Sequence, residues 1–288
     1  YALAIGPAVI SLPAVTLPAG FTGVAYNPSV APATGGTAPY TYFLSGGAVA
    51  AGLQRGGAGA LTGNPGAAGA FNFAVSATDS STGTGPYTGS RNHSITVGNV
   101  VVTLADLVLG GGTLSPAFAP GTTAYAASVG NATASVTVTP TLADPAATVS
   151  VNGVAVASGS PSGAIALAIG ANTISVVVTG RDGTTTRTYT VIVTRAKAAQ
   201  AIVFGPAPVL ASGGTATVSA TGGASGNPVV FTSTTPGTCT VSGTTVSGLA
   251  AGTCTIAADQ AGNAEYEDAP QVTQSFAVSP DPVRLTNN

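Results

Sequence analysis

Short runs of alternating apolar and polar residues recur along the whole chain. Apolar residues occupy every second position in these runs, which is the pattern of a β-strand with one buried face. Clear examples lie at Ser135–Thr139, Ile174–Val178 and Thr188–Val193. Gly, Pro, Ser, Thr and Asn fill the gaps between runs and favour tight turns. The pattern therefore predicts an all-β chain built from many short strands.

The runs fall into three blocks. We expect three tandem immunoglobulin-like β-sandwich domains, because 288 residues exceed the usual size of one hydrophobic core. The expected limits are residues 7–98, 99–195 and 200–279, followed by a polar tail at 280–288. The junctions at Gly98-Asn99 and at Ala196 to Gln200 are short, which predicts limited flexibility between blocks.

Three details of the middle block can be tested directly. Asn152-Gly153 separates two strand runs, and both residues tolerate the positive φ of a two-residue hairpin turn. Asp182-Gly183 is expected to form the same kind of turn before the final run of the block. Ile165–Ile169 also alternates and is expected to form a strand.

The first six residues, Tyr1 to Gly6, form a run that is separate from the first block. Their alternation matches that of His93–Gly98, the expected closing strand of that block. We interpret them as the last strand of a preceding repeat, either in a longer array or as a strand donated to a neighbouring molecule by β-strand addition. Tyr1, Leu3 and Ile5 would then share one face and expose an unpaired edge. The alternative is an ordinary N-terminal strand that pairs within the first block.

Charged residues are scarce. Lys and Arg number 7 and Asp and Glu number 9, about 6% of the chain, whereas ordinary domains carry about 25%. A net charge of −2 argues against nucleic acid and anionic membranes as partners, because both require a basic patch. The long uncharged stretch between Asp144 and Arg181 is interrupted by Gly and Pro, so it supplies no membrane span of about 20 apolar residues.

Two cysteines, Cys239 and Cys254, lie 15 residues apart in runs expected to form adjacent strands. A disulfide closing such a loop contributes roughly 3 kcal/mol in the chain-entropy model, and it implies an oxidising, extracytoplasmic setting. The alternative is a pair of buried free thiols. We expect the spacing to be too short for the inter-sheet bridge of an antibody domain, and one distant histidine cannot complete a zinc site with them. The chain opens at Tyr1 without a basic or apolar leader, so we expect a processed product or a piece of a longer protein.

Several runs carry a resemblance to known repeats. In the first block they are Leu17–Gly20, Gly23–Tyr26, Gly35–Tyr42, Ala50–Leu53, Leu61–Pro65 and Ala77–Asp79. Together they resemble the immunoglobulin-like repeats of large bacterial surface proteins, with departures at Ala50-Ala51 and Asn64 that fall in loops. In the second block the runs are Leu114–Phe118, Pro120–Tyr125, Val151–Gly153 and Tyr189–Arg195. These resemble the cadherin-like β-sandwich repeat of bacterial surface proteins.

The third block resembles another bacterial immunoglobulin-like repeat, in which a cysteine pair is common. The runs that carry this resemblance are Phe204–Pro206, Val218–Val229, Thr238–Gly243 and Ala251–Ile256. All three resemblances imply β-sandwich folds on a bacterial surface. Calcium-binding cadherins use acidic linker motifs, and the junctions here contain none, so the resemblance implies no calcium.

Candidate catalytic residues are few, and we expect no enzyme, cofactor or metal site. His93 is the only histidine, so a Ser-His-acid triad could be built only there. It lies in an expected closing strand and is interpreted as a structural residue of the core face or its rim. Most acids, such as Asp79, Asp144 and Asp182, occupy turns. The densest acidic group lacks calcium-loop spacing and is interpreted as a solvated loop: Asp259, Glu265, Glu267 and Asp268.

Two classes of function remain. The leading hypothesis is a secreted, extracellular or cell-surface structural protein that self-associates head to tail, as a repeat segment or subunit of a fibre, sheath or stalk. Its low charge allows such faces to associate without desolvating ions. The alternative is an adhesin segment that binds a glycan or a host protein. Tyr87, within Gly85–Gly89, is the candidate ligand contact, whereas Tyr40 and Tyr42 are expected to pack in the domain.

Overall fold

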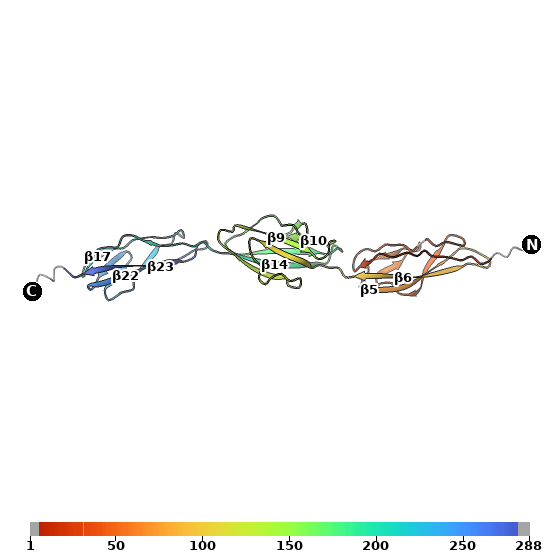
Figure 1. Ribbon diagram of the computed structural model, residues 1–288, viewed down its shortest axis with the longest axis horizontal. Helices are drawn as coiled ribbons and strands as arrows, with labels where there is room; N and C mark the ends of the chain where they lie inside the picture. Colours follow the sequence, from red (N-terminus) through yellow and green to blue (C-terminus); the bar gives the residue numbers. More distant parts are fainter. Residues whose placement is uncertain (1–5, 31, 282–288) are drawn as a thin grey trace, which may run out of the picture.

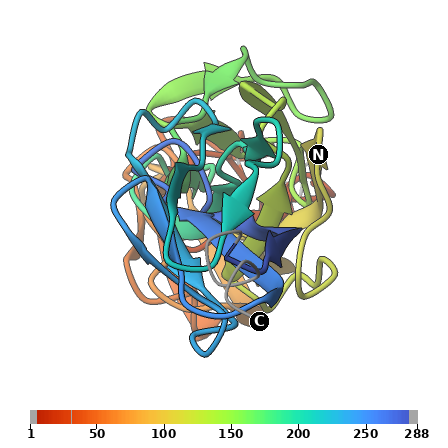
Figure 2. The same cartoon turned by 90° about the vertical axis from the view of Figure 1, so that its left-hand side faces the viewer.

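Residues 6–30 and 32–281 are described by a computed structural model, and within these ranges the chain forms strands and turns but no helix. The predicted all-β fold is therefore confirmed. Three groups of strands follow one another along the long axis of the molecule (Figure 1). Seen along that axis, the groups lie one behind another (Figure 2). We call them the N-terminal block (residues 7–98), the middle block (99–195) and the C-terminal block (200–279).

The N-terminal block contains a four-stranded sheet and a separate hairpin. The sheet has the order β1 (Gly20–Phe21), β6 (Thr88–Gly98), β5 (Gly69–Thr78), β2 (Thr41–Gly47), and the hairpin joins β3 (Leu53–Arg55) to β4 (Leu61–Gly63). Alternate residues of the two long strands are buried, among them Phe73, Val75, Ile95 and Val97. They pack with Leu61 and other apolar residues into one core.

The middle block is a sandwich of two sheets. One has the order β11 (Val154–Val156), β10 (Thr148–Val151), β13 (Gly170–Thr179), β14 (Thr186–Arg195), β8 (Ala124–Val129). The other has the order β12 (Ile165–Ala166), β9 (Ser135–Leu142), β7 (Leu104–Gly110). Ile174, Val176 and Val178 of β13 are fully buried and belong to the same core as Val136 and Val138 of the opposite sheet. Each such side chain contributes about 1.5–3 kcal/mol by leaving water.

The C-terminal block also places two sheets against each other. Its larger sheet has the order β16 (Leu210–Ala211), β23 (Ala269–Ser279), β22 (Gly252–Gln260), β19 (Val229–Ser233). Its smaller sheet has the order β17 (Thr215–Thr217), β21 (Thr245–Gly248), β20 (Cys239–Ser242). A short pair, β15 (Val203–Phe204) and β18 (Ala220–Thr221), lies beside them. Buried residues of both sheets, such as Val246 and Ile256, share one core.

Only one of the two predicted hairpin turns has the predicted form. Val151 pairs with Val154, and φ is 48° at Asn152 and 81° at Gly153, so this two-residue turn is confirmed. The prediction for Asp182-Gly183 is wrong, because the flanking strands end at Thr179 and resume at Thr186, leaving a six-residue loop, 180–185. The carboxylate at 182 accepts main-chain N–H groups from the next residues and stabilises this wider loop.

The strand expected at Ile165–Ile169 is shorter than predicted, because β12 ends at Ala166. Leu167 is still buried, but the Asn172 side chain accepts from the Ala168 N–H at 2.9 Å and donates to the Ala168 carbonyl at 2.8 Å. These bonds turn the chain from one sheet towards β13 of the other sheet.

The final strand has the same direction in all three blocks, and this direction defines two ends for each block. In each, the final strand (β6, β14 or β23) runs along the axis towards the C-terminal side of the molecule (Figure 1). We call the side where this strand begins the entry end of the block and the side where it finishes the exit end. Near the exit end the final strand pairs in parallel with an earlier strand: β1 with β6, β8 with β14, and β16 with β23.

Candidate functional site

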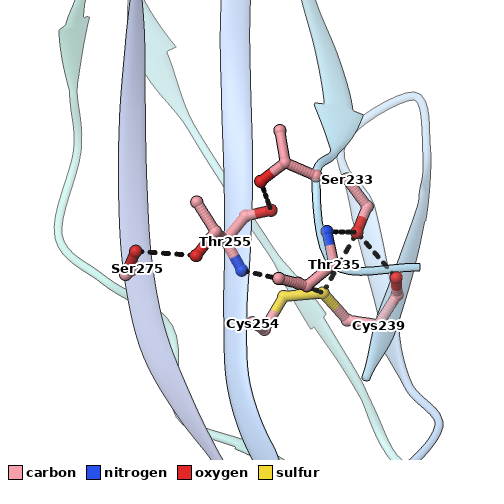
Figure 3. The surroundings of a disulfide bond; sticks show 7 residues. Ser233, Thr235, Cys239, Cys254, Thr255 and Ser275 are labelled. Carbon is pink, nitrogen blue, oxygen red and sulfur yellow. Dashed lines mark hydrogen bonds between the residues drawn. A yellow bond between two sulfur atoms is a disulfide. The ribbon is translucent and has the colours of Figure 1, made fainter. Parts of the chain in front are cut away.

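The predicted disulfide joins Cys239 of β20 to Cys254 of β22, with the Cα atoms 5.7 Å apart. These strands belong to opposite sheets, so the bond bridges the sandwich (Figure 3). Two expectations are therefore wrong: the cysteines do not lie in adjacent strands, and their spacing does allow an inter-sheet bridge. The reason is that β21 first returns beside β20 as a hairpin, and Leu249–Ala251 then carry the chain to the other sheet.

Hydroxyl groups surround this disulfide (Figure 3). Ser233 donates a hydrogen bond to the Cys239 carbonyl at 2.7 Å, and its Oγ lies 3.4 Å from the Cys239 Sγ. Thr235 Oγ1 accepts from the Thr255 N–H at 2.9 Å. Both cysteines are fully buried. Paired and buried sulfurs offer no thiolate for nucleophilic or metal chemistry, so the bond is a structural element.

Tyr87 ends the loop Asp79–Tyr87 at the entry end of the N-terminal block. Its ring packs partly against the core, and its hydroxyl lies 2.7 Å from Thr84 Oγ1. The nearly buried Asp79 carboxylate accepts from the N–H groups of Thr37 and Tyr87, at 3.0 and 2.7 Å, and from Ser81 Oγ at 2.8 Å. Burial alone would raise the pKa of Asp79, but these donors outweigh it and hold the pKa below its ordinary value. The loop is thus ordered by its own hydrogen bonds.

His93 is buried on β6, and its ring stacks on Phe73 with the centroids 5.9 Å apart. Burial lowers the pKa of His93, and the positive charge of Arg91 lowers it further. Within residues 6–30 and 32–281, the Nε2 atom has no hydrogen-bond partner. No serine or carboxylate in these ranges therefore completes a triad through that nitrogen.

The acidic group of the C-terminal block is bound to neutral protein groups. Asp259 accepts two hydrogen bonds from the Gln271 amide, at 2.9 and 3.0 Å, and Asp268 accepts one from the Gly262 N–H at 2.7 Å. In the part of the chain that the structure describes, no cluster of three or more His, Cys, Asp or Glu residues could hold a metal ion.

Other predicted residues lie apart from these places. Tyr1, Leu3 and Ile5, the proposed assembly strand, lie outside the described residues, so that interpretation stays a prediction. Tyr42 is buried and its hydroxyl accepts from the Ala33 N–H at 2.8 Å, while Tyr40 packs at the edge of the same core. Among the described residues, no helix has the length and apolar character needed to cross a membrane.

The contacts between blocks were not predicted from the sequence. At the first junction, the Arg181 guanidinium of the middle block lies over the Phe21 ring of the N-terminal block, 3.6 Å from its centroid. Arg181 also donates two hydrogen bonds to the largely buried Asp144 carboxylate, at 2.8 and 2.6 Å. The carboxylate therefore fixes the orientation of a cation that stacks on the neighbouring block.

Close packing completes the first junction. A Cβ at Gly180 would lie 2.2 Å from Val100 Cγ1 and 3.1 Å from Val102 Cγ1, so the linker rests directly on the glycine backbone. The Val100 N–H also donates to Thr22 Oγ1 at 3.4 Å, which is a long hydrogen bond. The linker is thus held by both blocks.

The charges of this junction persist across the physiological pH range. The two bonds from Arg181 lower the pKa of Asp144, helped by the Ala146 N–H. The hydroxyl and N–H of Thr185 lower the pKa of Asp182 to about 2, and the N–H of Thr184 contributes. Both carboxylates therefore stay ionised well below neutral pH.

The second junction is held mainly by the main chain. The Ala198 N–H donates to the Glu265 carbonyl at 2.8 Å, and the Glu267 N–H donates to the Ala198 carbonyl at 2.9 Å. On the other side, the Asn131 side chain donates to the Ala196 carbonyl at 3.2 Å. Lys197, the only lysine in the sequence, is exposed between these two anchored residues.

A cleft of about 590 Å³ separates the two blocks at this second junction. Its walls are Asn131, Ala168, Ile169 and Arg195 of the middle block with Ala264, Glu265 and Tyr266 of the C-terminal block, beside Ala198 of the linker. The side chains of the two blocks therefore leave open space between them at this junction.

Comparison with known proteins supports the resemblances of the first two blocks. Residues 97–196 match the family model "Cadherin-like beta sandwich domain", and residues 7–98 match the model "Putative Ig domain". A stretch of 92 residues is 46% identical to a "Putative membrane protein" of Evansella cellulosilytica, and this stretch is 32% of the present chain and 14% of that protein. The match thus spans only a small part of the relative's length.

Solved structures that match this chain include cadherin ectodomain fragments. Mouse Cadherin-23 EC22-24 has 14% sequence identity and a TM-score of 0.40, with coverage of 95% of this chain and 98% of that one. Human CDH23 EC21-23 has 13% identity and a TM-score of 0.39, with coverage of 90% and 96%.

Proposed function

We propose that this chain is a non-enzymatic structural segment of an extracellular or cell-surface bacterial protein. It acts as a spacer, or as a subunit of a fibre, sheath or stalk assembled head to tail. The main observation behind this proposal is the linear arrangement of three blocks of strands (Figure 1) with residue-specific contacts at both junctions. Such contacts maintain an extended shape, which is what a spacer or fibre subunit requires.

The chemistry of the described residues is consistent with a structural role. The candidate catalytic groups are satisfied by neighbouring backbone, as at Asp79, or are buried without a catalytic partner, as at His93. The inter-sheet disulfide fits an oxidising location outside the cytoplasm. Cadherin-like and immunoglobulin-like domains typically lack catalytic activity, which agrees with this proposal.

Self-association is the second part of the proposal. The sequence of Tyr1 to Gly6 alternates apolar and polar or small residues, a pattern that can add as a strand to an exposed sheet edge of another copy. Low surface charge removes much of the repulsion and ion desolvation that oppose such contact.

Electron microscopy of negatively stained, native material tests this proposal. We expect filaments or extended arrays whose repeat matches a line of sandwiches. Isolated rods or monomers at all concentrations, both with and without Tyr1 to Gly6, would contradict assembly. A flexible, collapsed particle in small-angle scattering would contradict the spacer role as well.

Adhesion is a second candidate, favoured by the location of Tyr87 in an ordered loop at one end of the molecule. An aromatic residue held in this way can stack on a sugar ring or on a protein side chain. Binding on a glycan array that is lost in Tyr87→Ala, but kept in Tyr266→Ala, would support this function. Equal binding by both variants would contradict a role for Tyr87.

A further inference from the structure

The first junction has two halves, and the N-terminal block supplies an exit turn, Gly20–Gly23. Phe21 pairs with Gly98, the last residue of β6, and the Thr22 N–H donates to the Gly98 carbonyl at 3.0 Å. Gly23 follows with φ of 75°, and its N–H donates to the Pro65 carbonyl at 2.9 Å. This turn meets the middle block, since a Cβ on Gly23 would lie 3.4 Å from an Asp182 carboxylate oxygen.

The same turn is present at the exit end of the C-terminal block, at Leu210–Gly213. Ala211 pairs with Ser279, the last residue of β23, and the Ser212 N–H donates to the Ser279 carbonyl at 2.9 Å. Gly213 follows with φ of 81°, and its N–H donates to the Gly248 carbonyl at 2.8 Å. Pairing, hydrogen bonds and the positive-φ glycine therefore correspond position by position to Gly20–Gly23.

The second half of the first junction is the entry loop of the middle block, residues 180–185. It precedes the final strand β14, and Asp182 orders it by accepting two main-chain N–H groups. The N-terminal block has a loop in the same place, Asp79–Tyr87 before β6. Asp79 also accepts two main-chain N–H groups, one from Tyr87 of this loop and one from Thr37 outside it.

The chain segments that lead into the N-terminal and middle blocks are also similar. Gly6–Ile10 and Gly98–Val102 both begin with glycine and end with two β-branched apolar residues. Val9 is 81% exposed, whereas Val101, which holds the matching position in the second segment, is 38% exposed. At its entry end, the N-terminal block thus has an ordered loop and an exposed valine. The entry end is also the end at which the middle block contacts the N-terminal block.

From this correspondence we propose that the exit turn Leu210–Gly213 of one molecule seats against the entry loop Asp79–Tyr87 of a second copy. The contact repeats, between molecules, the packing of Gly20–Gly23 on residues 180–185 within one molecule. It rests on the proposed head-to-tail assembly, for which it names the surfaces. Two different surfaces meet, and they lie on blocks at opposite ends of an extended molecule, so we expect the product to be a linear filament.

The chemistry of the two ends fits such a contact. The exit end has a cleft of about 470 Å³, and Leu249 in its wall is 53% exposed. The cleft is lined by Ser212, Gly213, Gly248, Leu249, Ala251, Pro280 and the acidic Asp281. Val9 and Tyr87 supply apolar surface on the entry side. Neither Asp79–Tyr87 nor Leu210–Gly213 contains a basic residue, and Asp79 is already satisfied by its amide donors. The contact therefore buries no unpaired cation.

The proposed contact is weaker than the first junction. Ala211 stands at the position of Phe21, and the loop Asp79–Tyr87 has no arginine, so no cation can stack across it. A contact between two loop ends belongs to the small interface class of less than about 1,200 Å², which gives transient association. Covalent trapping is consequently the appropriate test.

The experiment uses the full chain with two added cysteines, Thr82→Cys and Ser212→Cys, under mild oxidation. The native cysteines are already paired, so they do not compete. We expect a ladder of linear oligomers beyond the dimer, formed at least tenfold faster than in the control pair Thr82→Cys with Ser160→Cys, because Ser160 is exposed on the middle block away from both ends. Adding Leu249→Lys to the test pair should reduce the ladder to the control rate.

Equal rates for the test and control pairs, or no effect of Leu249→Lys, would overturn the proposed contact. If filaments appear by electron microscopy while the test pair reacts at the control rate, head-to-tail assembly stands and uses another part of the chain, such as the segment Tyr1 to Gly6. If neither filaments nor a ladder forms, both the contact and the assembly are wrong.

Discussion

The two junctions of this molecule connect successive blocks of strands by different means. The first uses side chains: Arg181 stacks on Phe21 and is oriented by Asp144, while the linker packs on Gly180. The second uses the main chain, because the linker residue Ala198 bonds through its own N–H and carbonyl groups to residues 261–268, the loop before β23 of the C-terminal block.

This difference indicates where each junction can move. At the first, both blocks hold the linker and a cation couples them directly. At the second, the middle block holds Ala196 and the C-terminal block holds Ala198, which leaves the exposed Lys197 between two fixed residues. We therefore expect a stiff first junction and a second junction that bends at Lys197.

The largest effect is expected from Arg181→Ala. The variant removes the stacking on Phe21 and leaves the Asp144 carboxylate without its partner, so the first junction should become at least as flexible as the second. Spin labels at exposed Ser90 and Ser160 report the distance across the first junction, and we expect its distribution to broaden about twofold or more. Arg187→Ala is the matched control, because Arg187 lies over Tyr189 within its own block. An unchanged distribution would contradict the role given to Arg181.

A somewhat smaller effect is expected from Gly180→Ala. The added Cβ would collide with Val100 and Val102, and overpacking of this kind typically destabilises by about 1–3 kcal/mol. Thermal unfolding should show the loss, and the linker should shift away from the middle block. Gly130→Ala is the control, because a Cβ added there would meet no atom within 4 Å and the residue is not in a positive-φ conformation. Equal unfolding temperatures for the two variants would show that the linker yields freely.

Gln200→Ala should loosen the second junction alone. The largely buried Gln200 amide donates to the Glu267 carbonyl at 2.8 Å and accepts from the Ser225 N–H at 2.9 Å. Unsatisfied buried groups cost about 1–3 kcal/mol, so cleavage after Lys197 by lysyl endopeptidase should accelerate about tenfold. The distance across the first junction should not change. A cleavage rate equal to that of the parent chain would place the bend elsewhere.

The smallest effect is expected from lowering the pH within the moderate range. Because Arg181 lowers the pKa of Asp144, the ionised pair stabilises the folded junction above the ordinary Asp pKa of about 3.9, and this stabilisation is lost as the pH falls through the lower folded value. Between pH 8 and 5 the distances across both junctions should stay constant. Under stronger acid only the first should broaden, as in Asp144→Asn at neutral pH. Broadening near pH 6 would contradict this account.

Much of the fold follows from local pattern. Alternation predicts β5, β6, β13 and β14, because one face of each strand is buried, and Asn152-Gly153 predicts its turn through positive φ. The same rule gives the wrong turn at Asp182-Gly183, because the Asp182 carboxylate stabilises a loop that is longer than the predicted two-residue turn.

The sites depend more on contacts between distant parts of the chain. The sequence suggests that Cys239 and Cys254 pair, but their places on opposite sheets depend on where the chain crosses after β21. Phe21 and Arg181 lie far apart in sequence, and no local pattern reports that they meet. Their only sequence signals are an aromatic residue in the short run Gly20–Gly23 and an arginine next to Asp182.

The parallel pairing of early and final strands has a consequence for the molecule under tension. Pulling along the axis loads such a pair in shear, so all hydrogen bonds between its two strands must break at the same time. The β8–β14 pair has six residue partners, whereas β1–β6 and β16–β23 have two each. We therefore expect the outer blocks to unfold under force before the middle block. The disulfide should keep the residues between Cys239 and Cys254 from extending when the C-terminal block unfolds.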